Sequence, residues 1–182
     1  PERIPYQRYL LPELLADVNQ GHNVRSTVFI EARAMYRRSG TAEMKTVGEV
    51  MAIGRTFKES LQKAMRSLEI GSFGFEPRVD LSPDRRDQAL DTVREKLKNP
   101  NSQRLWYLAD ALRLGIPAEE IYELSGFDPW FVEKVREIVA TEGEIAQHRG
   151  KLNEVGSETM RDWKQMGFAD SRLANLAGRT EE

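Results

Sequence analysis

One stretch of this sequence has a spacing close to that of a phosphate-binding loop. The segment TVGEVMAIGRT, residues 46–56, contains a glycine, five further residues, a second glycine and then Arg55 and Thr56. A P-loop has four residues between its glycines, followed by lysine and a serine or threonine that bind phosphate and Mg²⁺. Here the spacing is one residue longer and arginine replaces lysine. Glu59 follows Thr56 by three positions, and this pattern favours a helix capping box over a nucleotide site.

Other residues with catalytic or ligand-binding potential are scattered. His22 and His148 each stand alone in a polar stretch, and a lone exposed histidine is more often solvated than a metal ligand. No metal-binding histidine pair and no G-x-S-x-G nucleophile pattern is present. Arg33, Arg37 and Arg38 could form an anion-binding patch, although a solvated helix face is the simpler interpretation. We therefore predict no enzymatic activity, no small-molecule substrate, no cofactor, and no catalytic, cofactor-binding or metal-binding residues.

The composition is typical of a soluble, helix-rich globular protein. The 182 residues are 40 % hydrophobic and 31 % charged, with a formal net charge of −2. This charge gives no general attraction for nucleic acid or anionic lipid. No apolar run is long enough to cross a membrane. Cysteine is absent, which excludes disulfide and thiolate chemistry and fits a cytoplasmic location.

The chain divides into two predicted parts, residues 1–55 and residues 56–182. The first combines a helix around residues 11–18 and a short helix within 32–40 with strands at 23–31 and 45–53. The strand at 23–31 alternates β-branched and other residues with a period of two. This part should therefore hold at most one pair of strands, connected as a hairpin or by a crossover.

The second part carries helix signals alone, so the predicted fold is mostly α with a small N-terminal α/β segment. Apolar positions recur at helical spacing, and caps, prolines and glycines mark the ends. The expected helices begin at Thr56, Ser82, Ser102, Asp128 and Ser157. Gly143 and Gly150 bracket a polar stretch that is the best candidate for a linker. Trp106-Tyr107 and Trp130-Phe131 are aromatic pairs on helices and are expected to be core or interface anchors, since only one member of each pair can face fully inward.

A short internal repeat occurs twice in the second part. GIPAEEIYELSG, residues 115–126, matches GFADSRLANLAG, residues 167–178, in its terminal glycines and in its apolar positions. Each copy predicts a helix of about two turns between two glycines in the left-handed conformation. Two copies are too few for a solenoid and indicate two similar helical corners.

The repeat also permits a helix-turn-helix interpretation, which makes nucleic-acid binding an alternative function. The candidate recognition region, residues 118–144, carries eight acidic residues against Lys134 and Arg136. Such a surface would repel phosphate, which supplies most non-specific affinity for DNA. A structural helical corner is therefore the preferred interpretation.

Three long segments of this chain resemble the large subunit of carbamoyl phosphate synthetase. They are EMKTVGEVMAIGRTFKESLQKAMRSLEIGSFGFEP, RLWYLADALRLGIPAEEIYELSGFDPWFVEKVREIV and MRDWKQMGFADSRLANLAGRTEE, and they run from Glu43 to the end. The resemblance implies the tail of the first ATP-grasp half followed by the all-helical oligomerisation domain. It also implies that TVGEVMAIGRT is a final strand and turn, and that the nucleotide- and metal-binding residues lie upstream, so no catalytic residue carries over.

The first forty residues do not resemble the synthetase family. YLLPELLADVNQGHNVRSTVFIEARAMYRRSG resembles an early helix-strand stretch of metal-dependent amidohydrolases, which are TIM barrels, without that family's metal-binding histidines. Both families can supply a word such as M-K-x-V-G-E-V, which would place a junction between Glu43 and Val50. We therefore entertain the hypothesis that the chain is chimeric or artificial.

The leading functional hypothesis is a non-catalytic helical scaffold or oligomerisation module without a selected activity. The alternatives are a structural fragment of a carbamoyl phosphate synthetase large subunit, an enzyme fragment with residual nucleotide or amidohydrolase activity, and the nucleic-acid binder. Self-association as a dimer is expected. Residues 23–31 resemble a strand of a parallel barrel, where both edges of a strand are paired. With only one partner strand in the chain, at least one edge of that strand should stay open.

Overall fold

A computed structural model of the chain describes residues 26–30, 50–68 and 70–179. The helices predicted around residues 11–18 and within 32–40 lie outside this part of the chain. His22 and the arginines Arg33, Arg37 and Arg38 lie outside it as well.

Two short strands form the α/β element that the alternating pattern predicts. Strand β1 (Ser26–Ile30) pairs antiparallel with β2 (Val50–Gly54), so that Ser26 lies opposite Gly54. Among the described residues there is one strand pair, in keeping with the prediction, and it is antiparallel. Period-two alternation reports the two faces of a strand and says nothing about the direction of its neighbour.

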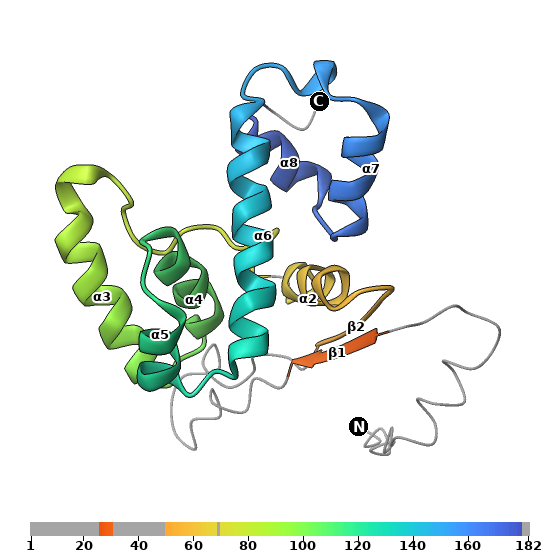
Figure 1. The fold of residues 1–182 in the computed structure, drawn as a ribbon. Helices are drawn as coiled ribbons and strands as arrows, with labels where there is room; N and C mark the ends of the chain where they lie inside the picture. Colours follow the sequence, from red (N-terminus) through yellow and green to blue (C-terminus); the bar gives the residue numbers. More distant parts are fainter. Residues whose placement is uncertain (1–25, 31–49, 69, 180–182) are drawn as a thin grey trace, which may run out of the picture.

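All other regular elements in the described chain are helices, and the predicted mostly α fold is confirmed. The helices are α2 (Phe57–Arg66), α3 (Arg86–Lys98), α4 (Arg104–Arg113), α5 (Ala118–Ser125), α6 (Pro129–Gln147), α7 (Ser157–Gln165) and α8 (Asp170–Leu176). Single 3₁₀ turns, η3 (Pro83–Arg85) and η4 (Leu152–Glu154), precede α3 and α7. Figure 1 shows α6 as a central column, with α3, α4 and α5 on one side and α2, α7 and α8 on the other.

The hydrophobic core forms where these helices face α6. The largest fully buried side chains include Trp106, Phe75, Phe168, Met65, Leu97, Leu108, Ile121 and Ile138. The helical periodicity explains most of them, since the predicted inward positions Leu61, Ala64 and Met65 of α2 are all buried. Trp106 and Tyr107 are both buried, however, because α4 is covered on more than one side.

Two predicted helix caps are confirmed. Thr56 is the N-cap of α2, and its Oγ1 accepts the Glu59 N–H at 3.2 Å. The reciprocal arm of the capping box is shifted by one residue, because the Glu59 carboxylate accepts the N–H of Arg55 at 2.7 Å. Asp128 caps α6 by accepting the Trp130 N–H at 2.8 Å, with Pro129 in the first turn.

Two other helices begin at different residues from those predicted. Ser157 is the first residue of α7 rather than its cap, and Gly156 occupies the N-cap position without a side-chain bond. Pro83 opens the 3₁₀ turn η3, and α3 itself begins only at Arg86. Proline fixes its own φ at a helix start but does not select between 3₁₀ and α hydrogen bonding.

The internal repeat has the predicted geometry. Gly115 and Gly126 flank α5 with φ of 78° and 70°, and Gly167 and Gly178 flank α8 with φ of 99° and 67°. Each copy also buries the apolar residue that follows its first glycine, Ile116 or Phe168, whose N–H bonds back to the end of the preceding helix. The two helical corners are thus built alike, as the sequence predicts.

The prediction of a linker between Gly143 and Gly150 is wrong. Helix α6 continues through Gly143 to Gln147, because Glu142 and Ile145 face the interior and hold this part of the helix in place. A single glycine costs a helix only about 1 kcal/mol, which such burial offsets. Among the described residues, no helix combines the length and the apolar character needed to cross a bilayer.

Candidate functional site

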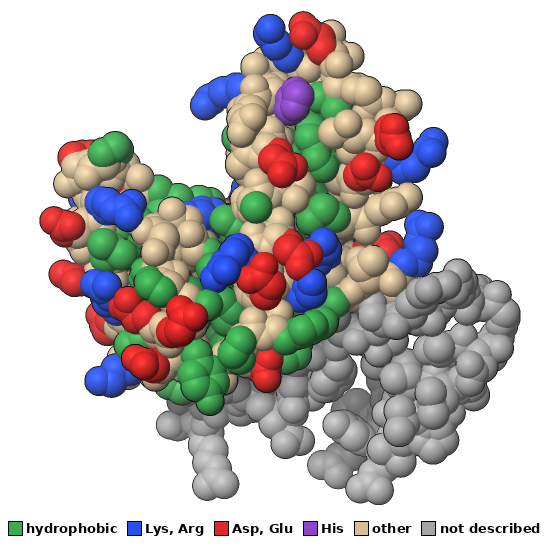
Figure 2. Space-filling model, in the orientation of Figure 1, with side chains coloured by type: hydrophobic (Ala, Val, Ile, Leu, Met, Phe, Trp, Pro, Cys, Tyr) green, Lys and Arg blue, Asp and Glu red, His purple; other side chains and the backbone are tan. Residues whose placement is uncertain are grey.

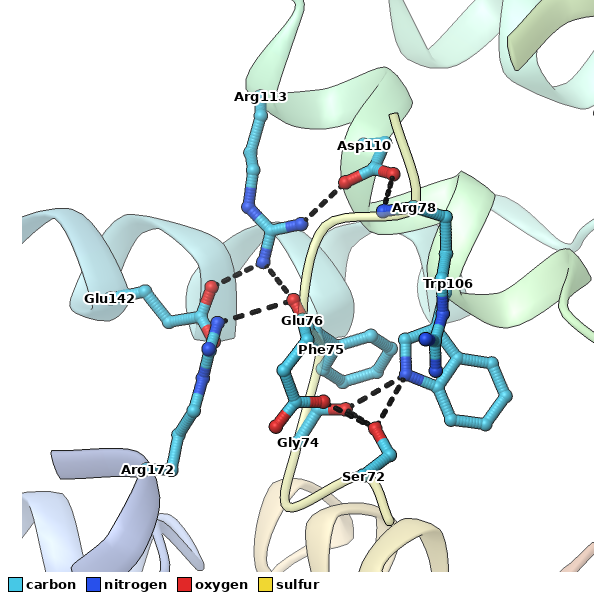
Figure 3. Close-up of polar contacts among 10 residues, drawn as sticks. All are labelled: Ser72, Gly74, Phe75, Glu76, Arg78, Trp106, Asp110, Arg113, Glu142 and Arg172. Atoms are coloured by element: carbon cyan, nitrogen blue, oxygen red, sulfur yellow. Dashed lines mark hydrogen bonds and ion pairs between the residues drawn. The ribbon is translucent and has the colours of Figure 1, made fainter. Parts of the chain in front are cut away.

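A cluster of polar side chains from several helices gathers around the segment 72–78 (Figure 3). Helix α4 supplies Trp106, Asp110 and Arg113, which share one face because they are spaced four and three residues apart. Helix α6 supplies Glu142, and α8 supplies Arg172. We call these charged residues together with the segment 72–78 the ionic junction.

The start of the segment is fixed by the indole of Trp106. Its Nε1–H donates to the Gly74 carbonyl at 2.9 Å and to Ser72 Oγ at 3.0 Å. Ser72 Oγ in turn bonds the Glu76 carboxylate, which also accepts the N–H of Phe73 at 2.8 Å. Because these bonds close a tight turn, Phe75 is directed into the core, where it is fully buried.

The end of the segment is fixed by Asp110. One oxygen of its carboxylate accepts the N–H of Arg78 at 2.7 Å, and the other accepts Nη1–H of Arg113 at 2.7 Å. Asp110 is completely buried, at 0 % exposure. Burial raises the pKa of its carboxyl, against the lowering effect of the Arg78 N–H and the Arg113 guanidinium.

Glu142 joins the two arginines of the ionic junction. Its Oε1 accepts Nη2–H and Nε–H of Arg172 at 2.6 and 2.9 Å, and its other oxygen pairs with Nη2 of Arg113. Both guanidinium groups also donate to the carbonyl of Phe75. Two arginines and two acidic residues therefore meet in the interior, where each charge has an opposite partner and several hydrogen bonds.

The Glu76 carboxyl has a pKa below its ordinary value. Burial alone would raise the pKa, but hydrogen bonds from Ser72 and the backbone, together with the charge of Arg172, stabilise the carboxylate and lower it. Glu76 thus belongs to the same electrostatic unit.

The charged groups of the ionic junction form ion pairs and hydrogen bonds that connect separate helices. Its carboxylates and guanidinium groups are engaged with each other, with the backbone or with Ser72, whose Oγ bonds the Glu76 carboxylate and accepts the Trp106 indole N–H. In the described ranges no group of three or more histidine, aspartate or glutamate side chains could hold a metal ion. The ionic junction is therefore suited to holding α4, α6 and α8 on one segment of chain.

The glycine-containing stretch that resembles a P-loop is a strand-to-helix turn in its described part, residues 50–56. Gly54 ends β2, and a Cβ at this position would lie 2.7 Å from the Ser60 backbone nitrogen. The glycine therefore allows the first turn of α2 to pack on the strand. Thr56 caps the helix, and the Arg55 side chain is largely exposed, 3.9 Å from the Glu59 carboxylate.

Several predictions about single residues change in the structure. His148 is half-buried rather than exposed, and its ring meets Trp163 edge-to-face at 5.7 Å. Glu142, counted as a phosphate-repelling surface acid, is buried in the ionic junction. In the pair Trp130-Phe131, both side chains are about half exposed, so neither member faces fully inward.

The sequence analysis missed the ionic junction entirely. A signal was present, since Asp110 and Arg113 lie in an otherwise apolar helix and share a face with Trp106. Their partners are distant in sequence, however, with 97 positions between Phe75 and Arg172. No local pattern predicts such contacts.

Comparison with known proteins places most of the chain in a known family. The family described as "Carbamoyl-phosphate synthetase large chain, oligomerisation domain" matches residues 49–182. The chain belongs to this family. The resemblance to the carbamoyl phosphate synthetase large subunit is thereby confirmed, and among the functional hypotheses the match favours the large-subunit fragment.

Individual relatives agree with the family match. The carbamoyl phosphate synthase large chain of Pseudomonas syringae pv. tomato is 44 % identical over 142 residues, which cover 78 % of this chain and 13 % of the relative. That of Xylella fastidiosa is 46 % identical over the same length. The N-terminal section of the large chain from Methanopyrus kandleri is 46 % identical over 156 residues, which cover 80 % of this chain and 27 % of that section.

The oligomerisation domain is a small part of these relatives. The chain spans 13 % of the length of the bacterial large chains it matches. The family match begins at residue 49, so it gives no support to the amidohydrolase resemblance of the first forty residues or to a chimeric origin.

Proposed function

We propose that this chain is a non-catalytic structural module that mediates self-association of carbamoyl phosphate synthetase large chains. The observation that carries the proposal is the match of residues 49–182 to an oligomerisation domain. The ionic junction supports the proposal of a structural module, because its buried charged groups pair with each other and hold the helices in place. A module that presents surfaces to partners benefits from such a rigid interior.

We further propose that the isolated chain forms a two-fold symmetric dimer. Within the described residues, β1 and β2 pair only with each other, so each has one edge without a strand partner there. Such an edge can recruit the same edge of a second copy, and a two-fold contact closes with one copy of the patch. The formal net charge of −2 gives little repulsion between copies.

Light scattering over a concentration series tests self-association. The mass should rise from 20.9 kDa towards twice that value as the concentration increases into the range of hundreds of micromolar, about where weak dimers form. Replacing Thr27, the second residue of β1, by proline should reduce the dimer, because proline removes a strand hydrogen-bond donor. A constant mass of 20.9 kDa would refute the dimer.

We make a separate proposal about the origin of the first part of the chain. We retain residues 1–55 and 56–182 as two domains, and residues 1–42 as an amidohydrolase-like segment joined to the synthetase sequence. Sequencing the gene at its native locus tests this, since a continuous upstream ATP-grasp sequence would contradict the joined origin.

A further inference from the structure

A small cavity lies where the chain that leaves the ionic junction runs alongside α3. One wall is formed by residues 78–80, and the other by Arg85, Gln88, Ala89 and Thr92. Its volume is about 210 Å³, which is below the roughly 300–1,000 Å³ of sites for drug-sized ligands. We call it the α3 cavity, and its size suits a small metabolite rather than a nucleotide.

The Arg78 side chain is held in a fixed orientation at this cavity. The Arg78 N–H donates to Asp110 at 2.7 Å, which is the contact that ends the ionic junction. Its guanidinium carbon lies 4.9 Å from the centre of the Trp106 ring, and Figure 3 shows the side chain running along the indole. Stacking of this kind fixes the planar fork of an arginine. A group that is fixed before the ligand arrives loses less entropy on binding.

The charge of Arg78 has no anionic partner in the described chain. Its Nε–H is buried without an acceptor there, and no carboxylate of the described residues forms an ion pair with it. Arg113 and Arg172, by contrast, each pair with a carboxylate in the ionic junction. A half-buried guanidinium without a counter-charge favours an oxyanion, which can accept two of its hydrogen bonds at once.

Arg85 supplies a second guanidinium on the other wall of the α3 cavity. Its Nε lies 3.6 Å from the Asp80 carboxylate, and both side chains are well exposed. Asp80 also accepts the N–H of Ser82 at 3.0 Å. The lining residues therefore present two guanidinium groups against one carboxylate, and this balance favours an anionic ligand.

The remaining lining residues indicate what accompanies the anionic group. Val79 and Ala89 offer apolar surface, and the carboxamide of Gln88 can donate or accept a hydrogen bond. The Thr92 hydroxyl donates to the Gln88 carbonyl at 2.9 Å, so its oxygen can act only as an acceptor towards a ligand. A hydroxyl on the ligand would meet this acceptor.

The surroundings of the α3 cavity do not form a general basic surface on the face drawn in Figure 2. Acidic and basic side chains are intermixed there over the part of the molecule formed by α3, α4 and α5. Long-range attraction of anions is weak over such a surface. Selectivity for an anion therefore depends on the two arginines themselves.

We propose that the α3 cavity binds a small organic anion that carries a carboxylate or phosphate group together with a hydroxyl. The anionic group contacts both Arg78 and Arg85, and the hydroxyl donates to Thr92. The ligand is bound and not chemically changed, and a nucleoside triphosphate is too large for the cavity. The site is separate from the strand edges on which the proposed dimer depends, so either proposal can fail without the other.

Nuclear magnetic resonance titration of the 182-residue chain at constant ionic strength tests the site. The probes are L-malate and glycerol 3-phosphate, which each join an anionic group to a hydroxyl. Both should shift the amide signals of residues 78–92 and the Nε–H signal of Arg78, and the tighter probe should have a Kd of about 1 mM or lower. Tighter binding of malate assigns the anionic group as a carboxylate, and tighter binding of glycerol 3-phosphate assigns it as a phosphate.

Two further compounds separate the contributions of the anion and the hydroxyl. Glycerol has no anionic group and should cause no shift. Succinate is malate without the hydroxyl and should bind at least about threefold more weakly, because the Thr92 oxygen then has no donor. Thr92→Val should remove this difference between malate and succinate.

Arg85→Gln is the decisive variant, because Arg85 is exposed and its replacement should leave the fold intact. It should weaken binding of the tighter probe at least about fivefold, and Arg78→Gln at least about tenfold, since hydrogen bonds between charged groups are the strong ones. Arg94→Gln is the matched control. Arg94 lies on the same helix and pairs with Glu120 at 2.6 Å outside the cavity, so its loss should leave the Kd unchanged.

Three results would overturn the proposal. Shifts that grow linearly up to about 20 mM of both probes would show that no site is present. Saturable binding that survives in both Arg85→Gln and Arg78→Gln would place the ligand elsewhere on the chain. An equal loss of affinity in Arg94→Gln and Arg85→Gln would mean that only the net charge of the protein matters.

Discussion

Thr56 shows how a single hydroxyl distinguishes a helix cap from a nucleotide site. Its Oγ1 accepts the Glu59 N–H at 3.2 Å and satisfies a backbone donor that has no partner within the helix. Thr56→Ala should lower the free energy of unfolding by about 0.5–2 kcal/mol, whereas Thr56→Ser keeps the acceptor and should cost little. Urea denaturation of the three proteins measures this. An unchanged midpoint for the alanine variant would contradict the cap.

Glu76 should make the stability depend on acid pH. Its pKa in the folded protein lies below the ordinary 4.5, so the ionised form stabilises the fold. This contribution is present above about pH 4.5 and is lost as the pH falls through the folded-state pKa. Glu59 and Glu137 act in the same direction, and Asp110, whose pKa is raised, acts in the opposite one.

Comparison of the wild type with Glu76→Gln isolates the contribution of this residue. The wild type should be the more stable protein at pH 7, and the difference in unfolding free energy should shrink between pH 5 and pH 3, approximately the range in which a carboxyl titrates. Denaturant titrations at each pH provide the values. A difference that stays constant with pH would show that Glu76 does not titrate in this way.

At the scale of elements, the pair of Arg172 and Glu142 holds α8 against α6. Arg172 is 4 % exposed, and its loss would leave the buried Glu142 carboxylate with Arg113 as its remaining cationic partner. Arg172→Leu should therefore lower the free energy of unfolding by about 3–5 kcal/mol. Thermal and urea unfolding both report this change.

Lys164→Leu provides the comparison for that prediction. Lys164 pairs with Asp170 at 2.9 Å, but both side chains are well exposed, so the loss should be below about 1 kcal/mol. Similar effects of the two substitutions would mean that the ionic junction does not depend on Arg172.

At the scale of the whole molecule, the chain should not bind ATP. The strand-to-helix turn uses Thr56 and Glu59 for capping, and Arg55 stands where a P-loop has lysine. Calorimetric titration with Mg-ATP should show no saturable binding with a Kd below about 1 mM. Arg55→Lys should not create a site, because the threonine hydroxyl stays engaged. Saturable binding by either protein would contradict this prediction.

The sequence by itself determined the features that depend on neighbouring residues. The caps at Thr56 and Asp128 follow from side chains that reach backbone groups two or three positions away. The glycines around α5 and α8 follow from a backbone conformation that other residues adopt only at a cost. The β1–β2 pair and the helical class of the second part follow from the period of the apolar residues.

Only the tertiary structure decided which faces were covered and which charges were paired. The same kind of aromatic pair is buried at Trp106-Tyr107 and open at Trp130-Phe131, because neighbouring helices cover α4 but leave the start of α6 exposed. Glu142 is a paired interior charge, and the polar stretch after Gly143 is helical, because α8 brings Arg172 to this turn of α6. Hydrophobic burial and ion pairing depend on distance in space, and a helical spacing fixes that distance only within its own helix.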